Sequence, residues 1–255
     1  MMIWNDSEGC PPVTVNVPDT ASLLDDLAAR FEAREGFSIA TINLDHVVKL
    51  ARDPAFREAY AAHSHVTADG NPIVWLEKLA GRSDVSLVPG SELIAPVAAL
   101  AAEKDVPVAL FGATESSLKL AAEALEAQNP GLKVVATLAP PMGFDPASEA
   151  AGALIEEIGA SGARLVFLAL GAPKQERFAA RAAAMLPEVG FMSIGAGLDF
   201  ISGEQKRAPL WVRKIAAEWL WRLLSSPKRL AARYGACILA LPGLTLRALK
   251  ARRTA

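Results

Sequence analysis

Cysteine and histidine are both scarce in this chain. The two cysteines among 255 residues, Cys10 and Cys237, lie near opposite ends, so the sequence indicates neither a disulfide framework nor a zinc site and suits a reducing cytoplasm. His46, His63 and His65 lack the Cys or carboxylate spacing that is typical of metal sites. We therefore expect no metal centre, and we expect the three histidines at the surface or on helices.

Common nucleotide-site signatures are missing. No Gly-x-Gly-x-x-Gly follows an apolar run and no Gly-x-x-x-x-Gly-Lys-Ser/Thr occurs, which argues against a dinucleotide oxidoreductase and a P-loop NTPase. A metal-binding Asp-x-Asp pair is absent too. Any nucleotide site must therefore be built in another way.

Long hydrophobic runs are absent as well. Residues 1–8 lack the basic and apolar regions of a secretory signal. The longest late apolar stretch, Ala236 to Leu246, is interrupted by Pro242 and falls well short of the roughly 20 residues that a spanning helix needs. We expect no transmembrane segment.

Positive charge is scarce in the first 200 residues, which carry a net charge of −12, whereas residues 201–255 carry +10. This basic segment also contains Trp211, Trp219 and Trp221. The combination fits nucleic acid, an anionic membrane or a substrate with a diphosphate. A solvated helix surface that pairs with the acidic body is the alternative for some of these charges, although it leaves the tryptophans unexplained.

The chain is rich in short apolar runs that alternate with helical patterns, and 52% of its residues are hydrophobic. This alternation predicts an α/β fold, with a Rossmann-like, mostly parallel sheet flanked by helices and a strand order that cannot be read. The expected strands are 37–42, 65–70 (a short strand or a turn), 106–111, 132–138, 165–170 and 191–194. The expected helices are 20–34 with Thr20 as the cap, 44–62, 72–79, 115–127, 148–158, one that opens at Pro173, and a helical region after Pro209.

Three regions follow from this pattern. We predict a variable N-terminal segment over residues 1–36, an α/β core over 37–200, and a basic helical C-terminal appendage over 201–255. Deletion from about Ser226 is expected to leave a folded core.

The most informative junction joins the apolar run 165–170 to Gly171-Ala172-Pro173-Lys174-Gln175-Glu176. A buried strand that runs straight into a helix, with Pro173 in the first helical turn, puts this loop at a strand's carboxyl end. Free N–H groups of the helix start would there meet an anion such as a nucleotide diphosphate, with Lys174 and Gln175 pointing at it. An ordinary strand-to-helix turn is the alternative, but a second strand, 191–194, ends in the similar loop 195–200.

Three further positions could carry chemistry. Thr41 and Asn43 follow the first strand and could meet a ligand, although Asn43 could equally cap the next helix. Asp69 precedes a helix, where the role of capping or turn residue competes with that of general base. Gly112, after the strand 106–111, opens another candidate anion contact at a helix start.

Together these elements resemble the WecG/TagA/CpsF family of bacterial glycosyltransferases over about Ile39 to Tyr234. Their order and spacing carry the resemblance, since each element alone is weak. The matching elements are Thr41-x-Asn43, Asp69-Gly70, Gly90-Ser91-Glu92, Phe111-Gly112, Gly171-x-Pro173-x-Gln175-Glu176, Gly195-Ala196 with Asp199, Gly203, Arg207-Ala208-Pro209, and Glu218-Trp219-x-x-Arg222-Leu223 with Pro227, Arg229 and Arg233.

The resemblance implies an inverting transfer, without metal or other cofactor, of a sugar from a UDP-sugar to a polyprenyl-diphosphate-linked sugar. It implies a peripheral enzyme of cell-surface or exopolysaccharide synthesis on the cytoplasmic face of the plasma membrane, with no nucleic-acid partner and with a homo-oligomer left open. Asp69 matches the catalytic base of the family. The implied substrate-binding residues are Thr41, Asn43, Gly112, Gly171, Pro173, Gln175, Glu176, Gly195, Asp199 and Arg207. The resemblance also implies that residues 37–200 are the catalytic core and that the appendage over 201–255 contacts membrane and substrate. The residues implied to hold the lipid diphosphate or the membrane are Arg222, Arg229 and Arg233.

One position departs from the family pattern. Leu87 stands where family members often carry an arginine that contacts phosphate, and Arg82 is the nearest arginine that could substitute. This departure is the sole support in the sequence for a second reading, a nucleotide-sugar or anion-binding module without turnover. A nucleic-acid-binding protein is a third reading, which rests on the basic tail alone.

Overall fold

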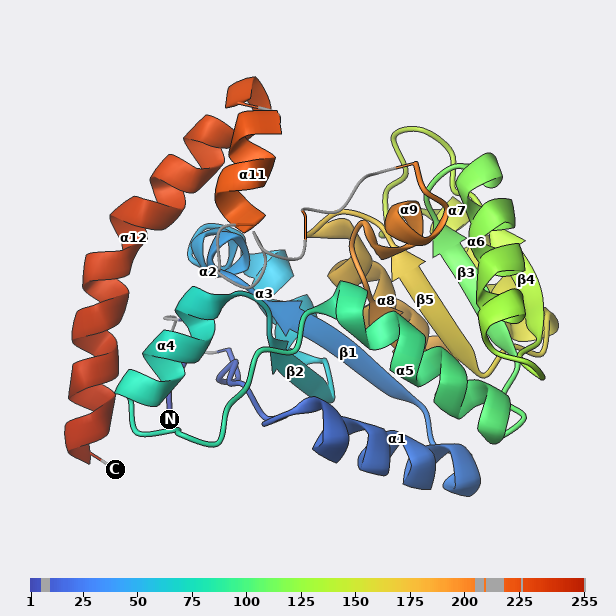
Figure 1. Ribbon diagram of the computed structural model, residues 1–255, viewed down its shortest axis with the longest axis horizontal. Helices are drawn as coiled ribbons and strands as arrows, with labels where there is room; N and C mark the ends of the chain where they lie inside the picture. Colours follow the sequence, from blue (N-terminus) through green and yellow to red (C-terminus); the bar gives the residue numbers. More distant parts are fainter. Residues whose placement is uncertain (6–9, 205–208, 210–217, 226, 255) are drawn as a thin grey trace.

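Six parallel strands form a single sheet with helices on both faces (Figure 1). The computed structural model describes residues 1–5, 10–204, 209, 218–225 and 227–254. The strands are β1 Phe37–Ile42, β2 His65–Ala68, β3 Val108–Gly112, β4 Val134–Leu138, β5 Leu165–Ala169 and β6 Gly190–Ser193. Their order in the sheet is β2-β1-β6-β5-β3-β4. The prediction of a Rossmann-like α/β fold is confirmed.

The helices cover the sheet in the way that strand alternation dictates. They are α1 Thr20–Ala33, α2 Leu44–Leu50, α3 Pro54–Ala61, α4 Asn71–Leu79, α5 Gly90–Glu103, α6 Glu115–Gln128, α7 Glu149–Ala160, α8 Lys174–Met185, α9 Gly197–Ile201, α11 Glu218–Ser225 and α12 Pro227–Thr254. In β5, Leu165 and Phe167 face α1, α5, α6 and α9, whereas Val166 and Leu168 face α7 and α8. A third core cluster joins α2, α3, α4 and α12 to β1 and β2.

Several helix boundaries differ from the prediction, and in two cases a capping aspartate is the reason. The side chain of Asp19 accepts a hydrogen bond from the Ser22 amide and caps α1, so the predicted cap at Thr20 is wrong by one residue. The single helix expected over 44–62 is two helices, because Asp53 caps a new helix that Pro54 opens.

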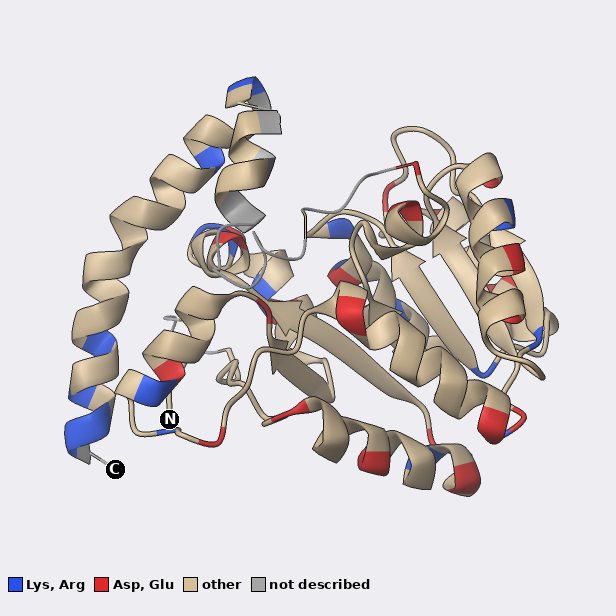
Figure 2. Cartoon of the chain, in the orientation of Figure 1, with Lys and Arg blue, Asp and Glu red and all other residues tan. Residues whose placement is uncertain are grey.

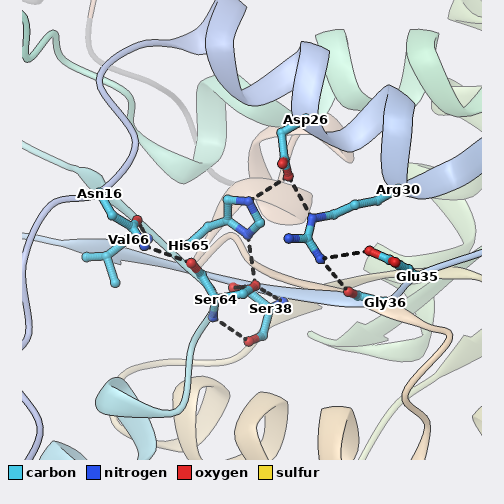
Figure 3. Close-up of polar contacts among 9 residues, drawn as sticks. All are labelled: Asn16, Asp26, Arg30, Glu35, Gly36, Ser38, Ser64, His65 and Val66. Atoms are coloured by element: carbon cyan, nitrogen blue, oxygen red, sulfur yellow. Dashed lines mark hydrogen bonds and ion pairs between the residues drawn. The ribbon is translucent and has the colours of Figure 1, made fainter. Parts of the chain in front are cut away.

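His65 is buried in a polar cluster at the amino ends of β1 and β2 (Figure 3). Its Nε2 lies 2.8 Å from Asp26 Oδ2, and its Nδ1 lies 2.8 Å from Ser64 Oγ. The same Ser64 hydroxyl accepts a hydrogen bond from the Ser38 amide and donates one to the Ser38 carbonyl. This serine, histidine and aspartate therefore tie α1 to two strands, at the edge opposite the loops that follow the strands.

The other two histidines are buried as well. Burial lowers the pKa of His46 to about 3 and that of His63 to about 4. His46 does lie on a helix, but the expectation of exposed histidines is wrong because aromatic neighbours, Phe56 and Tyr60 among them, pack around these rings.

The C-terminal helix α12 is part of the core. Its buried residues Leu230, Cys237 and Leu244 recur every seven positions, and Leu244 packs in the cluster that contains Trp4 and Val47. Deletion from about Ser226 would uncover the part of this cluster that Leu244 and Ala248 cover, whereas the other two core clusters contain no residue of α12, so a folded remainder stays a prediction. Among the described residues, no helix is both long enough and apolar enough to cross a membrane.

Candidate active site

The loops at the carboxyl edge of the sheet carry most of the predicted site residues. β1 is followed by Asn43, β2 by Asp69, β5 by the loop at Gly171 and β6 by the loop at Gly195. Because β2, β1, β6 and β5 are consecutive neighbours, these four loops adjoin. In open α/β sheets this is the edge at which ligands bind.

The capping role considered for Asn43 is confirmed, while contact with a ligand stays a prediction. Its Oδ1 accepts a hydrogen bond from the His46 amide and caps α2, while its Nδ2 donates to Asp69 Oδ2 over 3.4 Å. The Asp69 amide donates to the Ile42 carbonyl at 2.8 Å, which fixes this half-buried carboxyl beside the end of β1. The N-cap residue of α4 is Gly70, not Asp69. The structure thus brings together the two polar residues that sequence analysis drew from separate loops.

Gln175 joins the loop after β5 to the loop after β6. Its Oε1 accepts a hydrogen bond from the Gly195 amide at 3.1 Å, and its Nε2 donates to Glu176 Oε1 at 2.8 Å. The side chain is 3% exposed, so it supports the loops from below rather than pointing outward as predicted. Lys174, the first residue of α8, is exposed at the edge, and Pro173 is the N-cap residue rather than part of the first turn.

Glu176 is a fully buried carboxyl beneath these loops. Its Oε2 has no hydrogen-bond partner within the described part of the chain, and burial raises its pKa to about 7. The Tyr60 hydroxyl lies 3.1 Å from His46 Nδ1. Burial, followed by the negative charges of Glu176 and Asp69, raises the pKa of Tyr60 well above its ordinary value. A layer of buried titratable groups therefore underlies the edge.

A chain of ionic contacts connects α12 to the loop after β5. Arg233 lies 2.9 Å from Asp45 Oδ2, and Lys49 lies 2.8 Å from the same atom. Lys49 Nζ also donates to the Ala172 carbonyl at 3.0 Å. Sequence analysis missed Asp45 and Lys49, although their spacing of four on a helix that starts at Asn43 was a usable signal.

Thr41 is buried where α5 meets the sheet. It is 4% exposed, and a Cβ on Gly90 would lie 3.3 Å from its Cγ2 and 2.8 Å from the Ser193 carbonyl oxygen. The helix can therefore approach β1 and β6 so closely because position 90 has no side chain.

Gly112 and Asp199 mark a separate end of the edge. β3 lies four strands from β2, which corresponds to roughly 19 Å at the usual strand spacing. Gly112 has a φ of +100°, and a Cβ there would collide with the Ala169 backbone. Asp199 Oδ1 accepts a hydrogen bond from the buried Ser117 hydroxyl at 3.2 Å, which joins α9 to α6. The predicted residues therefore span the edge rather than gather at one point.

Of the four predicted arginines in the C-terminal region, the structure describes the side chain of Arg233. Arg207 lies outside the described residues, and the side chains of Arg222 and Arg229 are likewise not described. Arg233 is described, and its partner is Asp45. This pair is one instance of the alternative in which basic tail residues neutralise the acidic body.

Arg82 already forms an ion pair with Asp84. Its guanidinium contacts Asp84 at 2.7 Å and donates to the Val15 carbonyl, and the Asp84 contact raises its pKa. Leu87, at the position of departure, is exposed. The substitute role considered for Arg82 thus competes with an existing ion pair.

A comparison with known families covers nearly the whole chain. The model of the Glycosyl transferase WecG/TagA/CpsF family matches residues 11–255, including the loops at the carboxyl edge and both C-terminal helices.

Proposed function

The chain belongs to the WecG/TagA/CpsF family of glycosyltransferases, and from this premise we propose that it moves a sugar from a UDP-sugar to a polyprenyl-diphosphate-linked sugar with inversion. The polymer served is a bacterial cell-surface or exopolysaccharide. The pairing of Asn43 with Asp69 at the carboxyl edge is the observation that carries the proposal.

Asp69 is the proposed general base. It takes the proton of the acceptor hydroxyl as that oxygen forms a bond to the anomeric carbon, on the face opposite UDP. The bond from the anomeric carbon to UDP breaks, and the electron pair leaves on the β-phosphate. Asn43 donates to the Asp69 carboxylate, so it holds the base in one orientation before the reaction.

The negative charge on the departing UDP needs a counterpart. The first N–H groups of α8 and the exposed Lys174 lie at the edge next to the Gly195 loop, and helix starts of this kind favour anions. Arg207 is a further proposed contact. The length of the edge from Asp69 to Gly112 suits an extended nucleotide, with Asp199 near its far end.

Replacement of Asp69 by Asn tests the role of the base. Asn keeps the shape but cannot take a proton, so turnover should fall by roughly 10²–10⁴-fold while UDP affinity hardly changes. The measurement is UDP release over a panel of UDP-sugars with a polyprenyl-diphosphate-sugar acceptor, with the products identified by mass spectrometry. Asp105→Asn, an exposed site before β3, is the matched control. Normal turnover in Asp69→Asn, or an unfolded variant, would show a structural role instead.

We also propose that transfer needs no metal. Within the described ranges, no group of three or more His, Cys, Asp and Glu side chains is arranged to hold a metal ion. Excess EDTA should therefore leave the rate of UDP release unchanged. Strict dependence on added Mg²⁺ or Mn²⁺ would contradict the proposal that the N–H groups at the start of α8 stabilise the departing UDP.

Association with the cytoplasmic face of the membrane completes the proposal. Large apolar side chains are exposed on α11 and α12, beside the basic residues of the same helices. They are Leu220, Trp221, Leu224, Ile238, Leu239, Leu246 and Leu249. An exposed apolar patch with adjacent positive charge is typical of a surface that contacts anionic lipid.

A further inference from the structure

Glu176 takes no part in the proposed reaction steps, although its carboxyl is fully buried beneath the loops of the candidate site. It is the third residue of α8. The family resemblance assigns it to substrate binding, but a carboxyl that the folded chain covers completely reaches no ligand unless the loops above it open. Its role therefore has to be sought in the groups that it contacts within the protein.

One oxygen of this carboxyl is used and the other is not. Oε1 accepts a hydrogen bond from Gln175 Nε2 at 2.8 Å, whereas Oε2 has no hydrogen-bond partner among the described residues. Burial of a carboxyl costs free energy that an apolar side chain of the same length would not cost. What position 176 gains from a carboxyl is therefore an acceptor for the carboxamide of Gln175.

The carboxamide of Gln175 has to be held in one orientation. Its oxygen only accepts hydrogen bonds and its nitrogen only donates them, although the two ends have nearly the same shape. The oxygen accepts a hydrogen bond from the Gly195 amide at 3.1 Å. A half-turn of the carboxamide would set its NH₂ group against the Gly195 N–H, donor against donor. Because Glu176 Oε1 accepts a hydrogen bond from the nitrogen, it favours the orientation that holds Gly195.

Gly195 has no side chain that could anchor its own loop. It follows β6, and its φ of +57° lies in the left-handed region that favours glycine. A Cβ at this position would meet no described atom within 4 Å, so neighbouring side chains do not confine the loop at this point. β6 lies between β1 and β5, whose loops carry Asn43 and Gly171. The orientation of Gln175 therefore sets a loop in the middle of the candidate site.

We propose that Glu176 is a positioning residue, which orients the Gln175 carboxamide so that its oxygen holds the Gly195 loop in the arrangement that binds UDP. The inference rests on the proposed function for the identity of this ligand. Glu176 touches no reacting atom and acts through Gln175. Its acceptor oxygen, rather than its charge, is the required feature, so a neutral side chain with an oxygen at the same reach should replace it.

Binding of UDP to the full chain, measured by calorimetry, tests which feature of Glu176 matters. Glu176→Leu removes the acceptor and should weaken UDP binding roughly tenfold, since the Gly195 amide then loses its oriented partner. Glu176→Asp keeps the carboxyl but withdraws it by one methylene group, so it should weaken binding as Leu does. Glu176→Gln keeps an oxygen at the original reach and should bind UDP like the parent. Equal binding by Glu176→Gln and Glu176→Leu would overturn the proposal.

Glu77→Leu is the matched control for a general loss of stability. Glu77 is also a fully buried carboxyl, and it accepts a hydrogen bond from Trp4 Nε1 at 2.9 Å, outside the candidate site. Its replacement should lower the melting temperature as Glu176→Leu does, but it should leave UDP affinity unchanged. A similar loss of UDP binding in both variants would show that Glu176 supports the fold in general and has no positioning role.

A double variant tests whether Glu176 acts through Gln175. In a Gln175→Ala background, Glu176→Leu should weaken UDP binding no further, because a residue that acts through another has no separate effect once that residue is gone. Additive losses of UDP affinity would contradict the proposal.

Hydrogen exchange at the Gly195 amide reports on the loop without any ligand. Exchange should be faster in Glu176→Leu and Gln175→Ala than in the parent, and it should be unchanged in Glu176→Gln and Glu77→Leu. Unchanged exchange in Glu176→Leu would overturn the proposal even if UDP binding fell. The proposed function fails in a different way, namely when the parent neither binds UDP nor releases it with any acceptor while exchange at Gly195 still responds to Glu176.

Discussion

Glu176 makes the stability of the fold depend on pH. Burial raises its pKa from 4.5 to about 7, so between these pH values the folded chain retains a proton that the unfolded chain has lost. The stability that this group contributes is complete below pH 4.5 and is lost as pH rises through 7. Glu176→Gln removes the titration, so from pH 5 to pH 8 the parent should lose roughly 2 kcal/mol more unfolding free energy than the variant.

Denaturant unfolding of both proteins across that pH range provides the measurement. Glu157→Gln on the exposed side of α7 serves as the control, since its pH profile should follow that of the parent. Parallel profiles for the parent and Glu176→Gln would mean that the buried carboxyl is compensated by a charge.

At the scale of single residues, the sequence predicted which residues belong to the site better than it predicted what each of them does. Asp69 and Asn43 were singled out because polar side chains after parallel strands reach a common edge, and the structure brings them within 3.4 Å. The buried position of Gln175 could not be predicted, because the N–H group that it satisfies belongs to Gly195, on a different strand loop.

Replacing either of two adjacent residues at the start of α8 should affect UDP binding and melting temperature differently. Lys174→Ala removes an exposed charge near the proposed diphosphate, so it should weaken UDP binding with little change in melting temperature. Gln175→Ala leaves the Gly195 amide without its partner, which should cost about 1–3 kcal/mol of stability and also weaken UDP binding. Calorimetry with UDP and thermal unfolding of both variants distinguish ligand contact from loop support. Equal melting temperatures for the two variants would contradict the supporting role of Gln175.

At the scale of elements, buried strands were the easiest to predict. Continuous apolar runs such as 165–170 are long enough to mark a strand that is covered on both faces. Helix α5 was missed, because Pro89, Gly90 and Pro96 signal a break by local rules. The helix forms nevertheless, since Leu93, Ile94 and Val97 pack into the core cluster with β1 and β3. Tertiary packing outweighed local preference there.

At the scale of the whole molecule, strand order was the missing information. The alternation of strands and helices predicted a parallel sheet, but only the order β2-β1-β6-β5-β3-β4 reveals that Asp69 lies beside Asn43 and two strands from the Gly195 loop, whereas Gly112 lies four strands away. The packing of α12 against α2 could not be predicted from the sequence either, because these helices, Leu44–Leu50 and Pro227–Thr254, lie far apart along the chain.

The charge distribution of the whole molecule leads to the last prediction. Figure 2 shows Lys and Arg at both ends of α12, whereas acidic residues are frequent on α1 and α6. Positive charge near an anionic surface contributes about 1 kcal/mol per residue at most and is screened within a Debye length, so charge alone gives weak, salt-sensitive binding. Under the proposed membrane association, the exposed apolar side chains of α12 supply the remainder of the binding. Replacing Leu239 and Leu246 together by Ser should therefore lower partition onto anionic vesicles at least tenfold.

The matched control for this pair is Leu120→Ser with Met185→Ser, two exposed apolar residues on α6 and α8 whose loss should leave vesicle binding unchanged. Replacing Arg252 and Arg253 by Gln should weaken binding at low salt and have little effect at high salt, because these charges act only through the surface potential. Co-sedimentation with anionic and with neutral vesicles at two salt concentrations measures all three variants. If the Leu239 and Leu246 pair behaves like the control pair, the exposed face of α12 is an ordinary solvated surface, and Leu244 and Ala248 on the opposite face only pack against the core of the protein.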